Sequence, residues 1–228
     1  MSGKSFHQSL LRTLPLLLLA MLVSSCAIIN TPAHKEKVAL SHLRSDATAK
    51  YATFRAEKKW RNKTYRNEEI LSLANTENTK VIISIKDQRG ILLVDQMVAM
   101  DFPIASGKPN HPTPLGDFKI REKQQKYGSN IYGKIYDVTG VVVNAQADSK
   151  KDVIPEGGRF EGASMPYWMR LTDDGVGLHT GYVPGHPASH GCVRMPTKIT
   201  PVVFARVKIG TPVEIVQLFD PASLNKKK

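Results

Sequence analysis

The stretch KVIISIKDQRGILLVDQMVAM, residues 80–100, decides the fold class of this 228-residue chain. β-branched and aliphatic residues dominate both halves of the stretch, and a polar bend with Gln-Arg-Gly lies between them at residues 87–90. Apolar runs on either side of a short polar turn predict two strands joined as a hairpin. With 41% apolar and 23% charged residues, the chain is long enough for one core-forming domain with attachments.

Shorter runs after this hairpin also favour strands, and Gly, Pro or Asn turns separate them. They cover residues 117–120, 141–144, 168–172, 176–179 and 212–216. One late segment, TKITPVVFARVKIG at 197–210, predicts a helix, because Thr197 can cap it, Pro201 falls in its first turn and Gly210 follows its end. We therefore expect a mainly β domain, a small sandwich or barrel-like fold with one or two helices.

The first 26 residues have the pattern of a bacterial export signal. Lys4 and Arg12 accompany the apolar run LPLLLLAMLV at 14–23, which is too short to span a hydrocarbon core about 30 Å thick. The ending VSSC resembles a lipobox, in which Cys26 becomes the lipidated N-terminus of the exported protein. An ordinary signal peptide that contains a cysteine is the alternative.

This signal predicts a protein of the cell envelope, held on a membrane by lipid chains on Cys26. Ala27, and not Asp, follows the cysteine. In Gram-negative lipoproteins this resembles the pattern of the outer membrane, with the protein facing the periplasm.

Between the signal and the hairpin, residues 27–77 form a basic connector that we expect to be partly helical. Residues 35–66 hold ten Lys or Arg against three acidic residues. Apolar residues recur there at three- and four-residue spacing, which predicts a helical stripe that docks on the next domain: Leu40, Leu43, Ala47, Tyr51 and Phe54. The chain thus divides into a signal with its lipidation site (1–26), this connector (27–77), a β-rich domain (78–218) and a basic tail (219–228).

The formal net charge of +12 comes largely from the connector and the two ends of the chain. A basic segment often binds nucleic acid, but export removes nucleic acid as a partner. We expect attraction to anionic lipid, to an envelope polymer or to peptidoglycan carboxylates instead. A solvated linker without a partner is an equal alternative.

The chemistry lies in GLHTGYVPGHPASHGCVRMP, residues 177–196. Once Cys26 is lipidated, Cys192 is the one remaining thiol, and an exported lone thiol needs a function. His179 ends a predicted strand, and the Gly/Pro-rich loop after it is long enough to return Cys192 to His179 as a nucleophile to its base. The backbone N–H groups of His190, Gly191 and Cys192 could bind an oxyanion.

The competing interpretation is a metal site with ligands at His179, His186, His190 and Cys192. Their spacings of seven, four and two residues do not match common zinc patterns, and no second cysteine or carboxylate joins them. We therefore expect acyl transfer by a cysteine and a histidine, without a metal or another cofactor.

These residues carry a resemblance: HTG…PASHGCVRMP resembles the signature of the L,D-transpeptidase family, with YkuD-like catalytic domains. Earlier segments also resemble the family, namely IASGK (104–108), TPLGDFKI (113–120), SNIYG (129–133) and MPYWMRLT (165–172). The resemblance covers residues 80–216, and the loop between His179 and Cys192 is short for the family. It implies a small β-sandwich whose cysteine and histidine lie in a cleft under a mobile flap, within residues 121–165.

The resemblance also implies the reaction and its partner, the peptidoglycan stem peptide. Cys192 would attack the bond between the L-centre of a diamino acid and the terminal D-alanine, with His179 as the general acid and base and the Thr180 carbonyl orienting its ring. The acyl group would pass to an amine of a second stem, giving a three-to-three cross-link, or to a lysine of an envelope protein. With water as the acceptor the enzyme would be an L,D-carboxypeptidase. A catalytically inactive, peptidoglycan-binding lipoprotein is the non-enzymatic alternative.

Other residues of the motif have two interpretations each. Arg194 could pair with a stem carboxylate or support the loop through backbone carbonyls. Ser189 could touch substrate or, more simply, steady the cysteine loop. His190 could share the base role, but like Gly191 it is expected to contribute backbone to the oxyanion site. His186 is expected at the surface. Three further side chains could line the cleft or belong to the core: Tyr132, Met165 and Trp168.

Overall fold

The computed structural model describes residues 31–225, so the predicted signal and Cys26 lie outside the described residues. The helices are α2 (Pro32–Ala56), α3 (Glu68–Ser72) and α4 (Thr200–Arg206), with the 3-10 helices η1 (Trp60–Asn62) and η2 (Pro221–Asn225). The strands are β1 (Tyr65–Arg66), β2 (Thr79–Ser84), β3 (Arg89–Val94), β4 (Met97–Pro103), β5 (Gly116–Lys119), β6 (Glu122–Gln124), β7 (Gly128–Tyr136), β8 (Val142–Asp148), β9 (Arg159–Ser164), β10 (Trp168–Arg170), β11 (Gly177–Thr180), β12 (Val193–Met195) and β13 (Pro212–Val216). The prediction of a mainly β fold is confirmed, although the sheets of this part of the chain form no closed barrel. None of the described helices is both long and apolar enough to cross a membrane.

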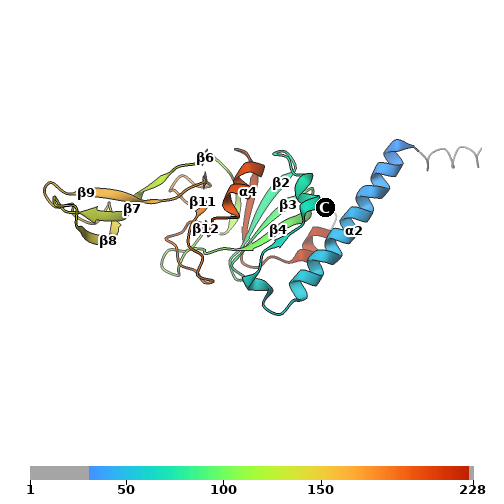
Figure 1. Ribbon diagram of the computed structural model, residues 1–228, viewed down its shortest axis with the longest axis horizontal. Coiled ribbons are helices and arrows are strands. Elements are labelled where there is room, and N and C mark those ends of the chain that lie inside the picture. The colour runs from blue at the N-terminus through green and yellow to red at the C-terminus, as the bar shows by residue number, and fades with distance from the viewer. Residues whose placement is uncertain (1–30, 226–228) are drawn as a thin grey trace, which may run out of the picture. The chain divides into compact units, whose positions relative to one another are not determined.

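A six-stranded sheet of order β1-β4-β3-β2-β13-β5 forms the core (Figure 1). β13 runs parallel to β2, whereas β2, β3 and β4 form an antiparallel meander. All residues of β3 are buried, and so are all but one of β2. This explains why the sequence of these strands is continuously apolar instead of alternating, since both faces of the sheet are covered.

Aromatic side chains from the end of α2, from η1 and from β1 cover one face of this sheet. They form one buried cluster with residues of the sheet and of the C-terminal segment: Tyr51, Phe54, Trp60, Tyr65, Ile82, Ile91, Leu93, Val98 and Phe219. Neighbouring rings in the cluster lie 5.2 to 6.2 Å apart. The predicted apolar stripe of the helix therefore docks from Ala47 onward, whereas Leu40 is exposed.

The described residues fall into two units, which divide between Asp46 and Ala47. The second unit contains residues 47–77, which the sequence assigned to the connector. It also contains Phe219, from the predicted tail, because this ring belongs to the buried aromatic cluster. The packed domain thus extends beyond the boundaries at 78 and 218, since segments on both sides cover the sheet.

A buried ion pair joins the sheet to this cover. Arg89 Nε donates to Asp101 Oδ1 at 2.6 Å, and both side chains are almost completely inaccessible to solvent. Tyr51 on α2 donates its hydroxyl to Asp101 Oδ2 at 2.7 Å. The other guanidinium nitrogens of Arg89 donate to the carbonyls of Arg61 and Lys63. The pair is therefore fully hydrogen-bonded, which is the condition for tolerating buried charge.

A four-stranded sheet of order β12-β11-β10-β6 lies beside the first and carries His179. β11 pairs parallel with β12 and antiparallel with β10. Ala105, just after β4, exchanges backbone hydrogen bonds of 3.0 and 2.9 Å with Arg194 of β12. The strand that follows the catalytic cysteine candidate is therefore tied directly to the end of the core meander.

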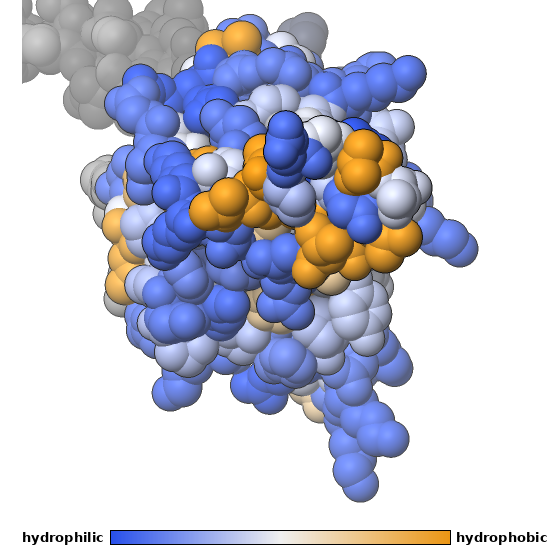
Figure 2. Space-filling model, turned by 90° about the vertical axis from the view of Figure 1, so that its left-hand side faces the viewer, coloured by the Kyte–Doolittle hydropathy of each residue, from blue (hydrophilic) through white to orange (hydrophobic). Residues whose placement is uncertain are grey.

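The remaining strands form a separate sheet of order β8-β7-β9, called the flap sheet below (residues 128–164). It extends away from the core sheet at the left of Figure 1. Apolar side chains at its end are exposed to solvent: Val138, Val141, Val142, Val143, Val153 and Ile154. Figure 2 shows this end, with orange groups scattered among hydrophilic residues.

Glycines allow the strands of the flap sheet to approach closely. A Cβ on Gly133 of β7 would lie 2.1 Å from the Glu161 carbonyl oxygen, and one on Gly162 of β9 would lie 1.8 Å from that of Ser129. No side chain fits at such distances, so these positions require glycine.

The stretch that decides the fold contains one turn more than the sequence predicted. The structure has three strands there, because Asp95 and Gln96 make a two-residue turn between β3 and β4 with φ of 46° and 65°. Hairpin turns with positive φ at both central residues usually contain Asn or Gly. Asp-Gln gave no such signal, so the prediction of two strands was wrong.

The late helix is shorter than predicted, since α4 covers only Thr200–Arg206. Thr197 is not its cap; Ile199 holds that position without a side-chain bond. Thr200 Oγ1 instead donates to the Pro196 carbonyl at 2.9 Å. Strands β1, β6, β7, β9 and β12 were not predicted, because they are short or rich in glycine and polar residues.

Candidate active site

The register of two parallel strands brings Cys192 and His179 to one face of the four-stranded sheet. Leu178 pairs with Val193, so one residue earlier Cys192 lies beside Gly177. Residues that face each other in a parallel pair share a face, and so do alternate residues of one strand, here Gly177 and His179. The thiol and the imidazole therefore lie diagonally across β11 and β12.

His179 is buried and held in one tautomer. Its Nδ1 lies 2.8 Å from the Thr180 carbonyl oxygen. Because a carbonyl only accepts, Nδ1 carries the proton and Nε2 keeps its lone pair as a base. Burial lowers the pKa of His179 from 6.5 to about 4; the bond to Thr180 opposes this and the charge of Arg194 adds to it. The imidazole is thus neutral at neutral pH.

Cys192 is a free, half-buried thiol. Its Sγ donates weakly to the Gly175 carbonyl at 3.6 Å. Burial raises the pKa of the thiol, the Gly177 N–H and the charge of Arg194 lower it, and the charge of Asp174 raises it again. Burial acts most strongly, so the resting pair is a neutral thiol and a neutral imidazole. Such a pair reacts by proton transfer during attack, with the imidazole as general base.

Hydrogen bonds within the segment fix the backbone around Cys192. Ser189 is buried; its hydroxyl donates to the Cys192 carbonyl and accepts from the Gly191 N–H at 3.1 Å. Gly191 has φ of +111°, a conformation that favours glycine. Thr113 Oγ1 donates to the Gly191 carbonyl at 2.7 Å. The Ser189 hydroxyl thus bonds the backbone of the cysteine loop at two places, and contact with substrate stays a prediction.

The segment after β4 supports the same loop from its other side. The backbone N–H groups of Ala188 and Ser189 both donate to the Ser106 carbonyl, and Lys108 N–H donates to the Ser189 carbonyl. The Gln88 side chain in turn bonds Ser106 twice, at 2.8 and 3.0 Å. The loop that presents the thiol is thus held by the core sheet.

The three amides predicted for an oxyanion site are not equivalent. The Gly191 N–H already donates to Ser189. Within residues 31–225, the N–H groups of His190 and Cys192 have no hydrogen-bond acceptor. These two amides are therefore available to a developing negative charge.

Arg194 lies opposite His179 in the parallel register. Its aliphatic stem packs over the Cα of Gly181, where a Cβ would lie 2.9 Å from Arg194 Cγ. No acceptor or carboxylate within the described chain pairs with its guanidinium, and its charge lowers the pKa values of His179 and Cys192. A half-buried guanidinium without a protein partner is suited to bind a carboxylate.

The side chain of His190 points to a cluster that includes the flap sheet. Lys108 Nζ donates to His190 Nε2 at 3.0 Å. Tyr132 of β7 stacks on the imidazole with ring centroids 4.4 Å apart, and His111 lies 4.9 Å from it. Burial, and the charges of Lys108 and His111, lower the pKa of His190. Tyr132 is thus a flap residue beside the catalytic loop.

His186 and Met165 are the remaining candidates from the sequence. His186 is exposed and contacts only the Pro187 carbonyl, at 3.1 Å. Met165 is half-buried, and its backbone N–H donates to the Tyr127 carbonyl. Among the described residues no three His, Cys, Asp or Glu side chains converge as metal ligands.

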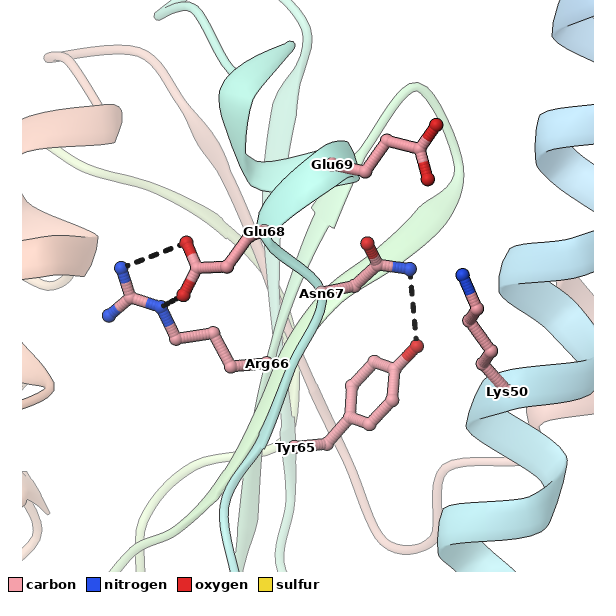
Figure 3. Close-up of a pocket in the computed structure, with 6 residues that line it drawn as sticks. All are labelled: Lys50, Tyr65, Arg66, Asn67, Glu68 and Glu69. Atoms are coloured by element: carbon pink, nitrogen blue, oxygen red, sulfur yellow. Dashed lines mark hydrogen bonds and ion pairs between the residues drawn. The ribbon is translucent and has the colours of Figure 1, made fainter.

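A pocket of about 420 Å³ lies away from these residues. Its lining comes from α2 and from the segment of β1 and α3: Lys50, Tyr65, Arg66, Asn67, Glu68 and Glu69. Figure 3 shows that Glu68 pairs with Arg66 and that Asn67 donates to the Tyr65 hydroxyl. None of the lining residues belongs to the catalytic motif.

Sequence analysis missed the residues that support the cysteine loop. Thr113, Ser106 and Lys108 belong to the segments TPLGDFKI and IASGK, whose resemblance to the family was a usable signal. Gln88 lies in the hairpin bend, where a polar residue predicts only a turn. Trp168 stands beside His179, with ring centroids 6.2 Å apart.

The model of the family described as "YkuD: L,D-transpeptidase catalytic domain" matches residues 78–215 of the chain. No curated protein matches this chain. Similar solved structures include the following three L,D-transpeptidases. An L,D-transpeptidase from Mycobacterium smegmatis is 22% identical over 61% of this chain and 58% of its own, with a TM-score of 0.47. One from Stackebrandtia nassauensis is 17% identical over 75% and 64%, with a TM-score of 0.45. One from Xylanimonas cellulosilytica is 18% identical over 62% of each chain, with a TM-score of 0.46.

This chain spans less than two thirds of the length of these three structures. The family model, however, matches more than half of the 228 residues and includes both His179 and Cys192. The chain therefore belongs to the L,D-transpeptidase family, with a YkuD-type catalytic domain.

Proposed function

We propose that this protein is a peptidoglycan L,D-transpeptidase with Cys192 as its nucleophile and His179 as its general acid and base. One observation carries the proposal: the register of β11 and β12 gives the thiol and the free Nε2 of the imidazole a common face. Family membership makes the stem peptide the natural acyl donor.

In the proposed reaction, His179 Nε2 accepts the thiol proton as Cys192 Sγ attacks the carbonyl between the diamino acid and the terminal D-alanine. The N–H groups of His190 and Cys192 stabilise the oxyanion. The C–N bond then breaks, D-alanine leaves with the proton from His179, and a thioester remains. An acceptor amine attacks the thioester, gives a proton to His179, and Cys192 leaves and is reprotonated.

Arg194 is proposed to bind a carboxylate of the donor stem. Its guanidinium has no pairing partner within the described chain, and its charge acts on both catalytic side chains. A paired carboxylate would fix the stem relative to Cys192, which favours attack at one peptide bond.

Incubation with tetrapeptide muropeptides tests the reaction. The protein should release D-alanine and form a cross-linked dimer, and Cys192→Ala should do neither. Cys192→Ala that retains either activity overturns the mechanism. Tripeptide monomer without dimer would assign water as the acceptor, and a stem linked to an added lysine peptide would assign a protein acceptor.

Intact mass spectrometry after exposure to a carbapenem tests the nucleophile without any peptidoglycan substrate. A reactive thiol opens the β-lactam ring and retains it as a thioester, so we expect a single stable adduct on Cys192. An unmodified protein would support the inactive, binding-only alternative.

We also propose that the protein is exported and anchored by lipid on Cys26 in the cell envelope. The lipobox-like VSSC at residues 23–26 supports this. Metabolic labelling with a fatty acid and membrane fractionation test it, and Cys26→Ala should abolish both the label and the membrane association. Label that persists in Cys26→Ala would contradict the anchor.

A further inference from the structure

Trp168 occupies the strand position opposite His179. In the antiparallel pair of β10 and β11, Met169 faces Leu178 and Arg170 faces Gly177. One position further along, Trp168 therefore faces His179, and opposed residues point to the same face of a sheet. The indole thus shares its face with the imidazole, and Trp168 is completely buried.

The indole also reaches the neighbourhood of the thiol. A Cβ on Gly177 would lie 2.5 Å from Trp168 Cη2, so the benzo ring covers the Cα of Gly177. Gly177 is the residue beside Cys192, and its N–H lowers the pKa of that thiol. Trp168 therefore spans from the residue that neighbours the nucleophile to the imidazole of the base.

The indole ring is held in a fixed plane. Tyr127 stacks on it with ring centroids 4.8 Å apart and an angle of 12° between the planes. Arg170 lies over the same indole at 5.6 Å, and its guanidinium also donates to the Tyr127 hydroxyl and to Glu122. A side chain held by two neighbours can fix its own neighbour, here His179.

The Trp168 Nε1–H is buried without a hydrogen-bond partner in the described chain. A buried indole N–H usually finds an acceptor. This N–H does not, so the indole is retained here for its shape and for the water that it excludes. A smaller apolar residue would remove no hydrogen bond, which makes substitution a clean test.

We propose that Trp168 is a positioning residue, whose indole keeps water from His179 and holds the imidazole with Nδ1 donating to Thr180 and Nε2 free for the Cys192 proton. This inference rests on the proposed function where it treats His179 as the base of the reaction. Its structural part concerns the tautomer of His179 and the exclusion of water from the imidazole, and this part does not depend on that function.

The charged and titratable groups around the dyad come from each neighbouring element. They are Glu122 of β6, Tyr127 of the following turn, Arg170 of β10, Asp174 of the β10–β11 turn, and Cys192 and Arg194 at β12. Only Arg194 acts on the pKa of His179 by charge, and it acts in the same direction as burial. Loss of burial is therefore the change that would raise this pKa.

Nitrogen NMR of the imidazole, with Trp168→Leu, Trp168→Phe and the control Ile83→Ala, tests the proposal in the full domain. Ile83 of β2 is also completely buried, but belongs to the core sheet. We expect wild type and Ile83→Ala to show the Nδ1–H tautomer with the same titration midpoint. Trp168→Leu should mix the tautomers and raise the midpoint by about one pH unit, as water reaches the ring. Trp168→Phe should restore most of the wild-type behaviour.

The pH profile of Cys192 alkylation gives a second readout that needs no peptidoglycan. Trp168→Leu and Trp168→Phe could lower only the melting temperature, as Ile83→Ala is expected to do. If the tautomer, the titration midpoint of His179 and the alkylation profile of Cys192 then stay unchanged, Trp168 is a core residue and the proposal is overturned. If Trp168→Leu does not fold, the titration midpoint of Trp168→Phe decides: a midpoint above that of wild type, by less than the shift expected for Trp168→Leu, supports the proposal, and a midpoint equal to that of wild type overturns it. Absence of D-alanine release by wild type would defeat the proposed function and not this inference.

Discussion

The core sheet and the flap sheet are stabilised in opposite ways. In the core, β3 is buried along its whole length and a fully hydrogen-bonded ion pair, Arg89–Asp101, is closed off from solvent. In the flap sheet, valines are exposed and Lys151 pairs with Asp148 in contact with water, at 3.4 Å. Stability therefore concentrates where the cysteine loop is attached, and the sheet with Tyr132 is left free to open at lower cost.

The largest expected effect comes from breaking the buried ion pair. Asp101→Ala leaves the Arg89 charge and the Tyr51 hydroxyl without their acceptor, and should lower the free energy of unfolding by about 3–5 kcal/mol. Denaturant unfolding monitored by tryptophan fluorescence measures it.

The matched substitution in the flap sheet is Lys151→Ala, which removes the exposed pair with Asp148. It should leave the unfolding midpoint unchanged, since exposed pairs are screened by water. If Asp101→Ala and Lys151→Ala lose equal amounts of unfolding free energy, the two sheets do not differ in how their ion pairs contribute to stability.

Burial in the four-stranded sheet acts on the protonation of His179, and this gives the second effect. His179 has a folded pKa of about 4 against 6.5 in the unfolded chain. Between these values the unfolded chain binds more protons, so stability is lost as the pH falls from about 6.5 to about 4. The shift corresponds to about 3 kcal/mol.

Comparison of wild type with His179→Gln isolates this contribution. Glutamine does not titrate, so the difference between the two unfolding free energies should change across that pH window and be constant above pH 7. If the difference between the two unfolding free energies is constant from pH 4 to pH 7, the imidazole of His179 is not shielded from water.

Sequence patterns revealed the buried strands and the catalytic motif for physical reasons. Apolar runs identify the central residues of β2 and β3 because both faces of these strands are buried. Cys192 was singled out because it is the one remaining thiol if Cys26 is lipidated as proposed, and His179 because it ends a strand and precedes a Gly/Pro-rich loop. Their catalytic roles stay predictions until the thiol is tested.

Other features depend on partners far away in the sequence. The glycines of β7 and β9 are required by a facing backbone, so neither strand shows a β-branched run. The parallel register of β11 and β12 follows from pairing across a loop. Gln88 supports Ser106 across two strands, and nothing next to either residue indicates it.

The third effect compares two strand valines, one from each sheet. Val81 of β2 is completely buried, and Val143 of β8 is 52% exposed. Val81→Ala should cost about 2 kcal/mol, from lost burial and the cavity left behind. Val143→Ala should stay within about 0.5 kcal/mol. Thermal unfolding of both variants measures the two losses of unfolding free energy. If Val143→Ala loses as much as Val81→Ala, the flap sheet is packed against other residues in solution.

The smallest expected effect is a change in the pKa of the Cys192 thiol, caused by a substitution in the exposed turn that precedes β11. Asp174 is exposed, and its charge raises the pKa of the Cys192 thiol. Asp174→Asn should lower that pKa only slightly, because water weakens the effect of an exposed charge. The pH dependence of Cys192 alkylation measures the shift.

Asp173→Asn is the matched control, since Asp173 pairs with Arg121 at 2.8 Å and is absent from the main influences on the thiol. The Asp174 effect should also disappear at about 1 M salt, where the Debye length is about 3 Å. The shift caused by burial should persist at that salt concentration, because ions do not enter a packed interior. A thiol pKa that returns to its ordinary value in high salt would mean that surface charge, and not the buried position beside Gly177, controls the nucleophile.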